Sequence, residues 1–229
     1  SNGDRTVAIG FDAHGNSIST DNVAIGYGAA QFGGGNSSVT VGRAAGQFNS
    51  GNGTVLIGIN SSYLNQADFT VSLGNAAGFS NTSATKNTNV GYQAGYSNTT
   101  NTSNTNIGYE AGYSAIGAFN TFIGSESGKN NVRNGAVSNT ALGYYALRGA
   151  ASSQARECTA IGSGAASNVT GAYDSIFIGK GAASSFTSGG NVIVIGYNAQ
   201  ASSATATNEI TLGNASNNLL RIPGLGSTD

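Results

Sequence analysis

The chain has 229 residues, 36 of them glycine, with one cysteine, one proline, no tryptophan or methionine, and only 8% charged residues at a net charge of −1. This balance excludes a global field that would attract nucleic acid or an anionic membrane, and no apolar stretch approaches the roughly 20 residues of a membrane span. A single cysteine also excludes an intrachain disulfide framework.

Apolar residues recur at a fixed interval along the chain. An aliphatic residue followed by glycine appears thirteen times, at spacings of 16 to 19 residues. A register kept over thirteen copies predicts one repetitive structure and argues against the disorder that a composition rich in Gly, Asn, Ser and Thr suggests. The copies are Ile9-Gly10, Ile25-Gly26, Val41-Gly42, Ile57-Gly58, Leu73-Gly74, Val90-Gly91, Ile107-Gly108, Ile123-Gly124, Leu142-Gly143, Ile161-Gly162, Ile178-Gly179, Ile195-Gly196 and Leu212-Gly213.

Each repeat opens with a short predicted strand. The residue two positions before the aliphatic residue is β-branched in every copy, as in Val23 before Ile25. A spacing of two puts both side chains on one face of a strand, and β-branched residues suit a pleated surface. We expect this face to be the interior.

After the strand comes the glycine, which suits a bend or a close backbone approach. Three residues later the side chain is always tiny, either alanine, as at Ala29, or serine, as at Ser61. This pattern predicts a second, narrower inward strand, followed by a polar return loop.

One coil alone buries too little to offset its conformational entropy, so the coils must stack into a continuous thin core. The sequence therefore predicts an all-β fold, a parallel β-roll or β-solenoid of about 13 coils with repeats of 16–19 residues. We expect residues 1–216 to form this shaft and residues 217–229 to be a C-terminal extension leading to a downstream domain. At about 4.8 Å per strand the rod would be roughly 60 Å long.

Two features mark the middle of the chain. The 19-residue intervals from Gly124 to Gly143 and on to Gly162 predict longer return loops, which in solenoids often lie on a binding side but are also tolerated without a role. Four asparagines align one residue before the β-branched position and predict a hydrogen-bonded ladder along the axis. They are Asn87, Asn104, Asn120 and Asn139.

Residues for catalysis or metal binding are sparse. Glu110 and Glu126 share one position in successive coils, but strand parity places them outward on a solvated strand with no implied pocket. His14 is the only histidine and has no recognisable nucleophile beside it. One His and one Cys, Cys158, do not make a zinc site. We therefore predict that the chain is not an enzyme and has no cofactor or metal.

Aromatic and basic residues are the candidate receptor contacts. Tyrosines directly after the repeat glycine combine a flat apolar face with a polar tip, which suits sugar stacking, although stacking between coils explains them equally well. Basic residues cluster near the longer loops, where they would meet an anionic polysaccharide or remain solvated. The candidates are Tyr92, Tyr109, Tyr144, Lys129, Arg133, Arg148 and Arg156.

The repeat motif, as in residues 22–30 (NVAIGYGAA), resembles the head repeats of trimeric autotransporter adhesins, which form left-handed parallel β-rolls with three chains side by side. Residues 207–214 (TNEITLGN), followed by 219–224 (LLRIPG), are similar to shaft segments of bacteriophage tail fibres and related injection-system fibres. Both resemblances imply a homotrimer that touches a cell surface.

We expect from these resemblances a shaft of a phage or injection-system tail fibre, on a virion or extracellular particle. It would adhere to a host cell-surface glycan or protein, without nucleic acid and without being embedded in a membrane. The head of a trimeric adhesin on a bacterial surface is the first alternative. Bulky residues at the strand position expected to point outward, Leu56, Phe122, Phe177 and Val194, favour an interface between copies.

Two further classes remain open. A threonine rank from Thr88 to Thr159 suits a monomeric ice- or crystal-surface binder, but the rank shares the face that we assign to the core. A polysaccharide depolymerase would need a grooved carboxylate pair, and Glu110 with Glu126 is the pair to test.

Overall fold

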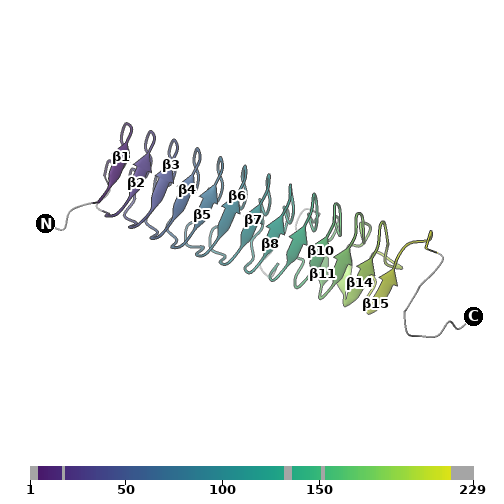
Figure 1. The fold of residues 1–229 in the computed structure, drawn as a ribbon. Helices are drawn as coiled ribbons and strands as arrows, with labels where there is room; N and C mark the ends of the chain where they lie inside the picture. Colours follow the sequence, from purple (N-terminus) through teal and green to yellow (C-terminus); the bar gives the residue numbers. More distant parts are fainter. Residues whose placement is uncertain (1–4, 17–18, 132–135, 151–152, 218–229) are drawn as a thin grey trace, which may run out of the picture.

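The computed structural model describes residues 5–16, 19–131, 136–150 and 153–217. The chain winds into a straight rod with its strands side by side along the axis (Figure 1). Thirteen short strands form one parallel sheet in the order β1 to β10, β12, β14 and β15, and β11 pairs with β13 in a second, two-stranded sheet. The predicted all-β solenoid of about 13 coils is confirmed.

The strands are β1 (Val7–Ile9), β2 (Val23–Ile25), β3 (Val39–Val41), β4 (Val55–Ile57), β5 (Val71–Leu73), β6 (Thr88–Val90), β7 (Thr105–Ile107), β8 (Thr121–Ile123), β9 (Thr140–Leu142), β10 (Thr159–Ile161), β11 (Gly171–Tyr173), β12 (Ile176–Ile178), β13 (Ser188–Gly190), β14 (Val192–Ile195) and β15 (Glu209–Leu212). No helix with the length and hydrophobicity of a membrane span occurs in the part of the chain that the structure describes.

Successive strands pair without stagger. Val23 of β2 lies opposite Val39 of β3, and Ile25 lies opposite Val41. The same one-repeat register continues to β15, where Ile195 lies opposite Leu212. Equivalent positions of the repeat therefore stack into straight columns along the rod.

The prediction of which strand face is the interior was wrong. From β2 to β14 of the large sheet the middle residue of each strand is buried. The four bulky residues that were predicted to form an interface between copies therefore lie in the core: Leu56, Phe122, Phe177 and Val194. The flanking side chains lie on the outer face, where Ile57 of β4 is 40% and Leu142 of β9 is 46% exposed. β-branched residues favour a pleated sheet on either of its faces, so they identify the strand without saying which face meets the core.

The prediction of a second inward strand after the glycine was also wrong, because the chain turns there. Gly26 has a φ of 129°, and a Cβ at this position would lie 2.6 Å from the carbonyl oxygen of Gly42 in the next coil. This backbone is accessible to glycine and closed to other residues. The small residue that follows does point inward, as expected, since Ala29 and Ala45 are fully buried.

The asparagine ladder is confirmed. The backbone N–H of Asn104 donates to Oδ1 of Asn87 at 2.8 Å, and that of Asn120 donates to Oδ1 of Asn104 at 2.9 Å. The backbone N–H of Asn139 continues the series to Oδ1 of Asn120 at 3.0 Å. All four side chains are buried, so the ladder satisfies polar groups inside the rod that would otherwise be costly to desolvate.

A second ladder runs through the return loops and was not predicted. Nδ2 of Asn65 donates to Oδ1 of Asn49 at 2.7 Å, and Nδ2 of Asn81 donates to Oδ1 of Asn65 at 2.9 Å. These side chains are also buried. The interior of this part of the rod is therefore held largely by side-chain amides.

The core changes character along the axis. From Ala111 to Ala206 the buried side chains form one continuous apolar cluster that includes Phe122 and Phe177. Nearer the N-terminus the middle strand position is often polar, as at Ser72, Asn89 and Asn106. The C-terminal half is thus stabilised by apolar burial, and the N-terminal half depends more on hydrogen bonds.

Candidate functional site

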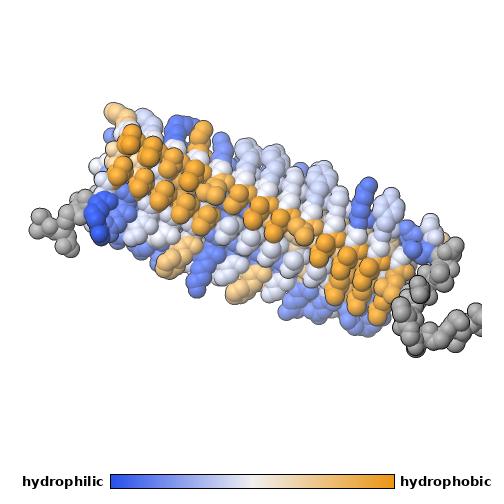
Figure 2. All heavy atoms as spheres, in the orientation of Figure 1, coloured by the Kyte–Doolittle hydropathy of each residue, from blue (hydrophilic) through white to orange (hydrophobic). Residues whose placement is uncertain are grey.

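The outer face of the large sheet carries two parallel rows of side chains. The proximal row consists of the residues directly before the repeat glycine: Ile9, Ile25, Val41, Ile57, Leu73, Val90, Ile107, Ile123, Leu142, Ile161, Ile178, Ile195 and Leu212. The distal row lies two residues earlier: Val7, Val23, Val39, Val55, Val71, Thr88, Thr105, Thr121, Thr140, Thr159, Ile176, Ile193 and Ile210. We call the two rows together the apolar stripe, which crosses the rod from end to end as the orange band in Figure 2.

The stripe is large for a solvent-exposed apolar surface. Twelve strand spacings of about 4.8 Å make it roughly 60 Å long, and two rows of side chains make it on the order of 600 Å² in area. Contiguous patches of this size on soluble proteins mark interaction sites. Because the strands stack without stagger, equivalent side chains of the stripe follow one another from strand to strand.

The distal row changes in blocks while the proximal row stays aliphatic. Five valines on β1 to β5 are followed by five threonines on β6 to β10 and three isoleucines on β12, β14 and β15. The orange band in Figure 2 is accordingly narrower in the middle of the rod. The five threonines lie on the outer face. They are therefore not part of the core, which was the argument against an ice- or crystal-surface binder.

Aromatic residues after the glycine border the stripe. Tyr92 and Tyr109 stack on each other with ring centroids 5.3 Å apart and are 45% and 50% exposed. Tyr144 stacks on its neighbour Tyr145 at 3.8 Å. The negative charge of Glu110 raises the pKa of Tyr109. The predicted Tyr92 and Tyr109 contacts are thus brought together and are about half exposed, and Tyr144 is not in contact with either ring. Their role as receptor contacts stays a prediction.

A longer aromatic ladder on another side of the coil was missed. Six rings from β2 to just after β7 contact in sequence, with centroid distances of 5.1 to 5.3 Å. Their signal was a recurrence six residues after the glycine in the first two of these coils and five residues after it in the next four. Stacking covers both faces of Phe79 and Tyr96, whereas Phe48 meets Tyr63 edge to face. The ladder therefore stabilises the coils and leaves little surface of the two central rings to a sugar. The rings are Phe32, Phe48, Tyr63, Phe79, Tyr96 and Tyr113.

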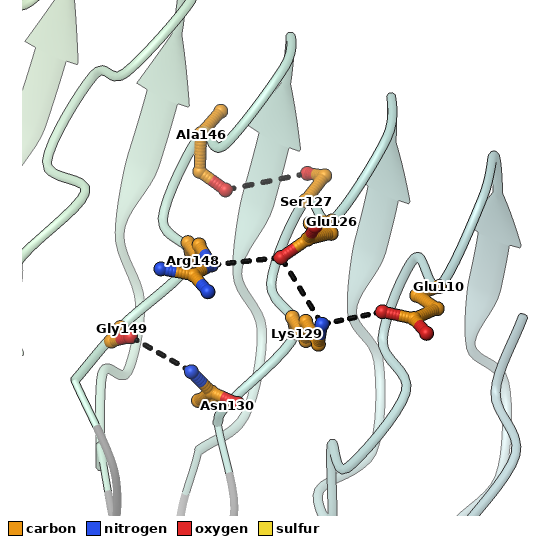
Figure 3. A network of polar contacts seen from close by, with 8 residues as sticks. All are labelled: Glu110, Glu126, Ser127, Lys129, Asn130, Ala146, Arg148 and Gly149. Carbon is orange, nitrogen blue, oxygen red and sulfur yellow. Dashed lines mark hydrogen bonds and ion pairs between the residues drawn. The ribbon is translucent and has the colours of Figure 1, made fainter.

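Lys129 and Arg148 take the place of the rings in the next two coils. The carbonyls of Tyr113, Lys129 and Arg148 accept equivalent hydrogen bonds from the preceding coil. Nζ of Lys129 pairs with Glu110 and lies 3.1 Å from Oε2 of Glu126, and Nε of Arg148 lies 2.9 Å from the same oxygen (Figure 3). The ladder therefore continues as an ion-pair network in which two cations neutralise two carboxylates.

This network corrects the placement of the glutamates. Glu110 and Glu126 were expected on a solvated strand, but they lie in turns and their side chains are only 15% exposed. Burial alone would raise the pKa of Glu126, but hydrogen bonds and charges from Lys129 and Arg148 outweigh it and hold that pKa below its ordinary value. Burial alone would lower the pKa of Lys129, and the two carboxylates raise it instead.

The network predicts a pH dependence of stability. The contribution of Glu126 is full above its unfolded-state pKa and is lost as the pH falls through its lowered folded-state pKa. We expect Glu126→Gln to lower the free energy of unfolding by about 1 kcal/mol at pH 7 and to have little effect once the pH is below both pKa values. Urea unfolding from pH 3 to 8 measures this. Exposed Glu157, whose pKa is raised by its hydrogen bond with Asp174, is the control, because Glu157→Gln should not destabilise. An equal loss in both variants would contradict the prediction.

The remaining basic candidates lie apart from the network. The Arg156 guanidinium lies 5.0 Å from the centroid of the Tyr173 ring, beside the small second sheet. Arg133 lies outside the described residues. Cys158 is buried, and desolvation raises the pKa of its thiol to about 12, which keeps it protonated and unreactive.

Comparisons add no assignment to these surfaces. In the described ranges no group of three or more His, Cys, Asp or Glu side chains is placed to hold a metal ion. No protein-family model, curated protein or solved structure matches this chain.

Proposed function

We propose that the chain is a structural fibre segment, an elongated shaft in which three copies associate through their apolar stripes. The fibre would belong to a phage or injection-system tail and would contact a host cell surface. The observation that carries the proposal is the stripe itself, a largely apolar surface along the whole described rod. The thin interior of a single coil supports it, because a rod of this shape gains apolar burial by pairing with copies of itself.

The position of the stripe suits copies that lie side by side. It occupies the outer face of the sheet, where its rows run parallel to the axis, so association along the stripe would extend over every strand. At about 25 cal/mol per Å², even partial burial of roughly 600 Å² per copy is a large favourable term for association, which must exceed the entropy cost of association. The copy number of three comes from the resemblance of the repeats to trimeric adhesin heads.

Light scattering on the purified chain tests the association. We expect a mass of three times 22.7 kDa. Replacing two central stripe residues by charges, Ile107→Lys with Ile123→Lys, should weaken the association at least tenfold, because two ammonium groups per copy would enter an apolar interface. Circular dichroism should remain that of the folded rod, since both side chains point outward.

A matched control is Ser50→Lys with Ser203→Lys, which adds two charges at exposed loop positions outside the stripe. This variant should keep the mass of the unmodified protein. A monomeric unmodified chain would overturn the trimeric shaft, and a trimer that survives both stripe substitutions unchanged would overturn association through the stripe.

One observation favours a second candidate, a monomeric ice- or crystal-surface binder. Thr88, Thr105, Thr121, Thr140 and Thr159 form a regular column on a flat outer face. Spacing of about 4.8 Å between hydroxyls would suit a periodic surface. If the chain is a monomer in the experiment above, the freezing point of its solution tests this candidate. Thermal hysteresis would support an ice binder, and its absence would contradict one.

A further inference from the structure

The threonine block of the distal row has unused hydrogen-bonding capacity. Buried threonines elsewhere use their hydroxyls, as Thr40 does toward the Val23 carbonyl at 3.2 Å and Thr54 toward Ser38 Oγ at 3.0 Å. None of the five outward hydroxyls of the block has a hydrogen-bond partner within the described ranges of the chain. The block is Thr88, Thr105, Thr121, Thr140 and Thr159.

These hydroxyls interrupt a surface that is otherwise suited to burial against another apolar surface without water. Valine and threonine have nearly the same shape, so exchanging one for the other changes polarity with little change in form. A hydroxyl buried against an apolar neighbour loses its water without replacement, whereas two hydroxyls that meet can bond each other. The block is therefore compatible with close association only where threonine faces threonine.

The block is also off-centre on the rod, with five strands on its N-terminal side and three on its C-terminal side. In a parallel association about an axis along the rod, identical strands meet at one height, and with the distal row next to that axis every threonine faces a threonine. Reversing one copy about the centre of the sheet would set Thr140 of β9 against Val71 of β5, and Thr159 of β10 against Val55 of β4. A parallel slip of one coil would set Thr88 against Val71 and Ile176 against Thr159.

We propose that the threonine block fixes the direction and register of the copies, so that the shaft assembles parallel and in register. This inference rests on the proposed association and adds its specificity. The aliphatic proximal row holds the copies together without distinguishing one height from another. The hydroxyls of the distal row supply the distinction, much as single polar residues select the register of apolar helical interfaces.

Distances between labels on different copies test the proposal. Cys158→Ser removes the native thiol, and serine occupies the equivalent position at Ser175. Spin labels are then attached at Gly34→Cys in one batch and Ser203→Cys in another, both at exposed loop positions near opposite ends. The batches are mixed by unfolding and refolding. In a parallel assembly the Gly34-to-Ser203 distances span about ten strand spacings, roughly 50 Å, whereas reversed copies bring these labels close together.

The decisive variant makes the block symmetric. Val55→Thr with Val71→Thr extends the block to β4 through β10, which is centred on the thirteen strands. In reversed copies every threonine then faces a threonine, and every aliphatic residue of the distal row faces an aliphatic residue. We expect the fraction of short Gly34-to-Ser203 distances to rise at least fivefold over the unmodified pattern. The matched control, Val55→Ile with Val71→Ile, changes the same sites without adding hydroxyls and should leave the distances unchanged.

The solution mass of each sample separates the two levels of the proposal. A monomer would overturn the association, and the register inference with it. A trimer with mixed orientations in the unmodified protein, or one whose distances do not change in the symmetric variant, would overturn only the role of the threonine block. A trimer that is parallel in the unmodified protein and mixed in the symmetric variant supports it.

Discussion

Phe122→Ala is expected to lower the free energy of unfolding by about 3–5 kcal/mol. The Phe122 side chain is fully buried at the point where the continuous apolar core begins. Its ring fills the space between the strand and the turn so closely that a Cβ added at Gly112 would lie 3.2 Å from it. Truncation would leave a cavity that neighbouring backbone cannot collapse to fill. Urea unfolding followed by circular dichroism, at one fixed protein concentration, measures the loss.

Phe119 provides the control for this prediction three residues away. Its side chain is 63% exposed, so Phe119→Ala should change the free energy of unfolding by no more than about 0.5 kcal/mol. If both variants lose the same stability, Phe122 is not a core residue and the placement of the inner strand face is wrong.

Gly42→Ala is the second substitution with a large expected effect. The backbone at Gly42 has a φ of 131°, and a Cβ there would lie 2.6 Å from the carbonyl oxygen of Gly58. The conformation alone costs other residues about 1–3 kcal/mol, and the overlap with the next coil adds to it. We expect a total loss of about 3 kcal/mol or more, seen as a lower urea midpoint.

Gly34→Ala tests whether this loss belongs to the repeat glycine. Gly34 is exposed in the preceding return loop, with no heavy atom within 4 Å of an added Cβ. We expect it to be neutral or slightly stabilising, because alanine restricts the unfolded chain. A loss at Gly34 that matches the loss at Gly42 would contradict the close approach between coils at the repeat glycine.

The repeat, its register and the fold class could all be predicted, because the Ile25-Gly26 step and its twelve equivalents fix where each strand ends. The direction of the core could not. Alternation separates two strand faces, but it identifies the inner one only when the outer one is polar. Here the outer face carries Val23 and Ile25, while the inner face carries Ala24 in one coil and Phe122 in another. The column of Asn87 and its equivalents was a stronger indication of the inner face. Asn87 lies two residues before the middle residue of its strand, so both side chains are on the same face.

The candidate contacts were only partly predictable for a related reason. Tyr92 and Tyr109 share a fixed distance from the repeat glycine, so their stacking followed from the register. The Lys129 and Arg148 pairs with Glu126 depend on how the turn after the glycine folds. That turn was predicted as a strand, which placed the carboxylates in solvent. The longer aromatic ladder was hidden by a change in its distance from the repeat glycine, from six residues at Phe48 to five at Tyr63.

The unstaggered stacking of the coils has a consequence for how the length of such a rod can change. Each inner strand of the large sheet pairs with its two neighbours in the order of that sheet. Removal or duplication of one complete repeat would therefore rejoin two compatible edges and leave the contacts at both ends as they were. The length of the rod therefore changes in whole steps of about 4.8 Å. A gene segment that encodes one repeat can be gained or lost while the other coils keep their contacts.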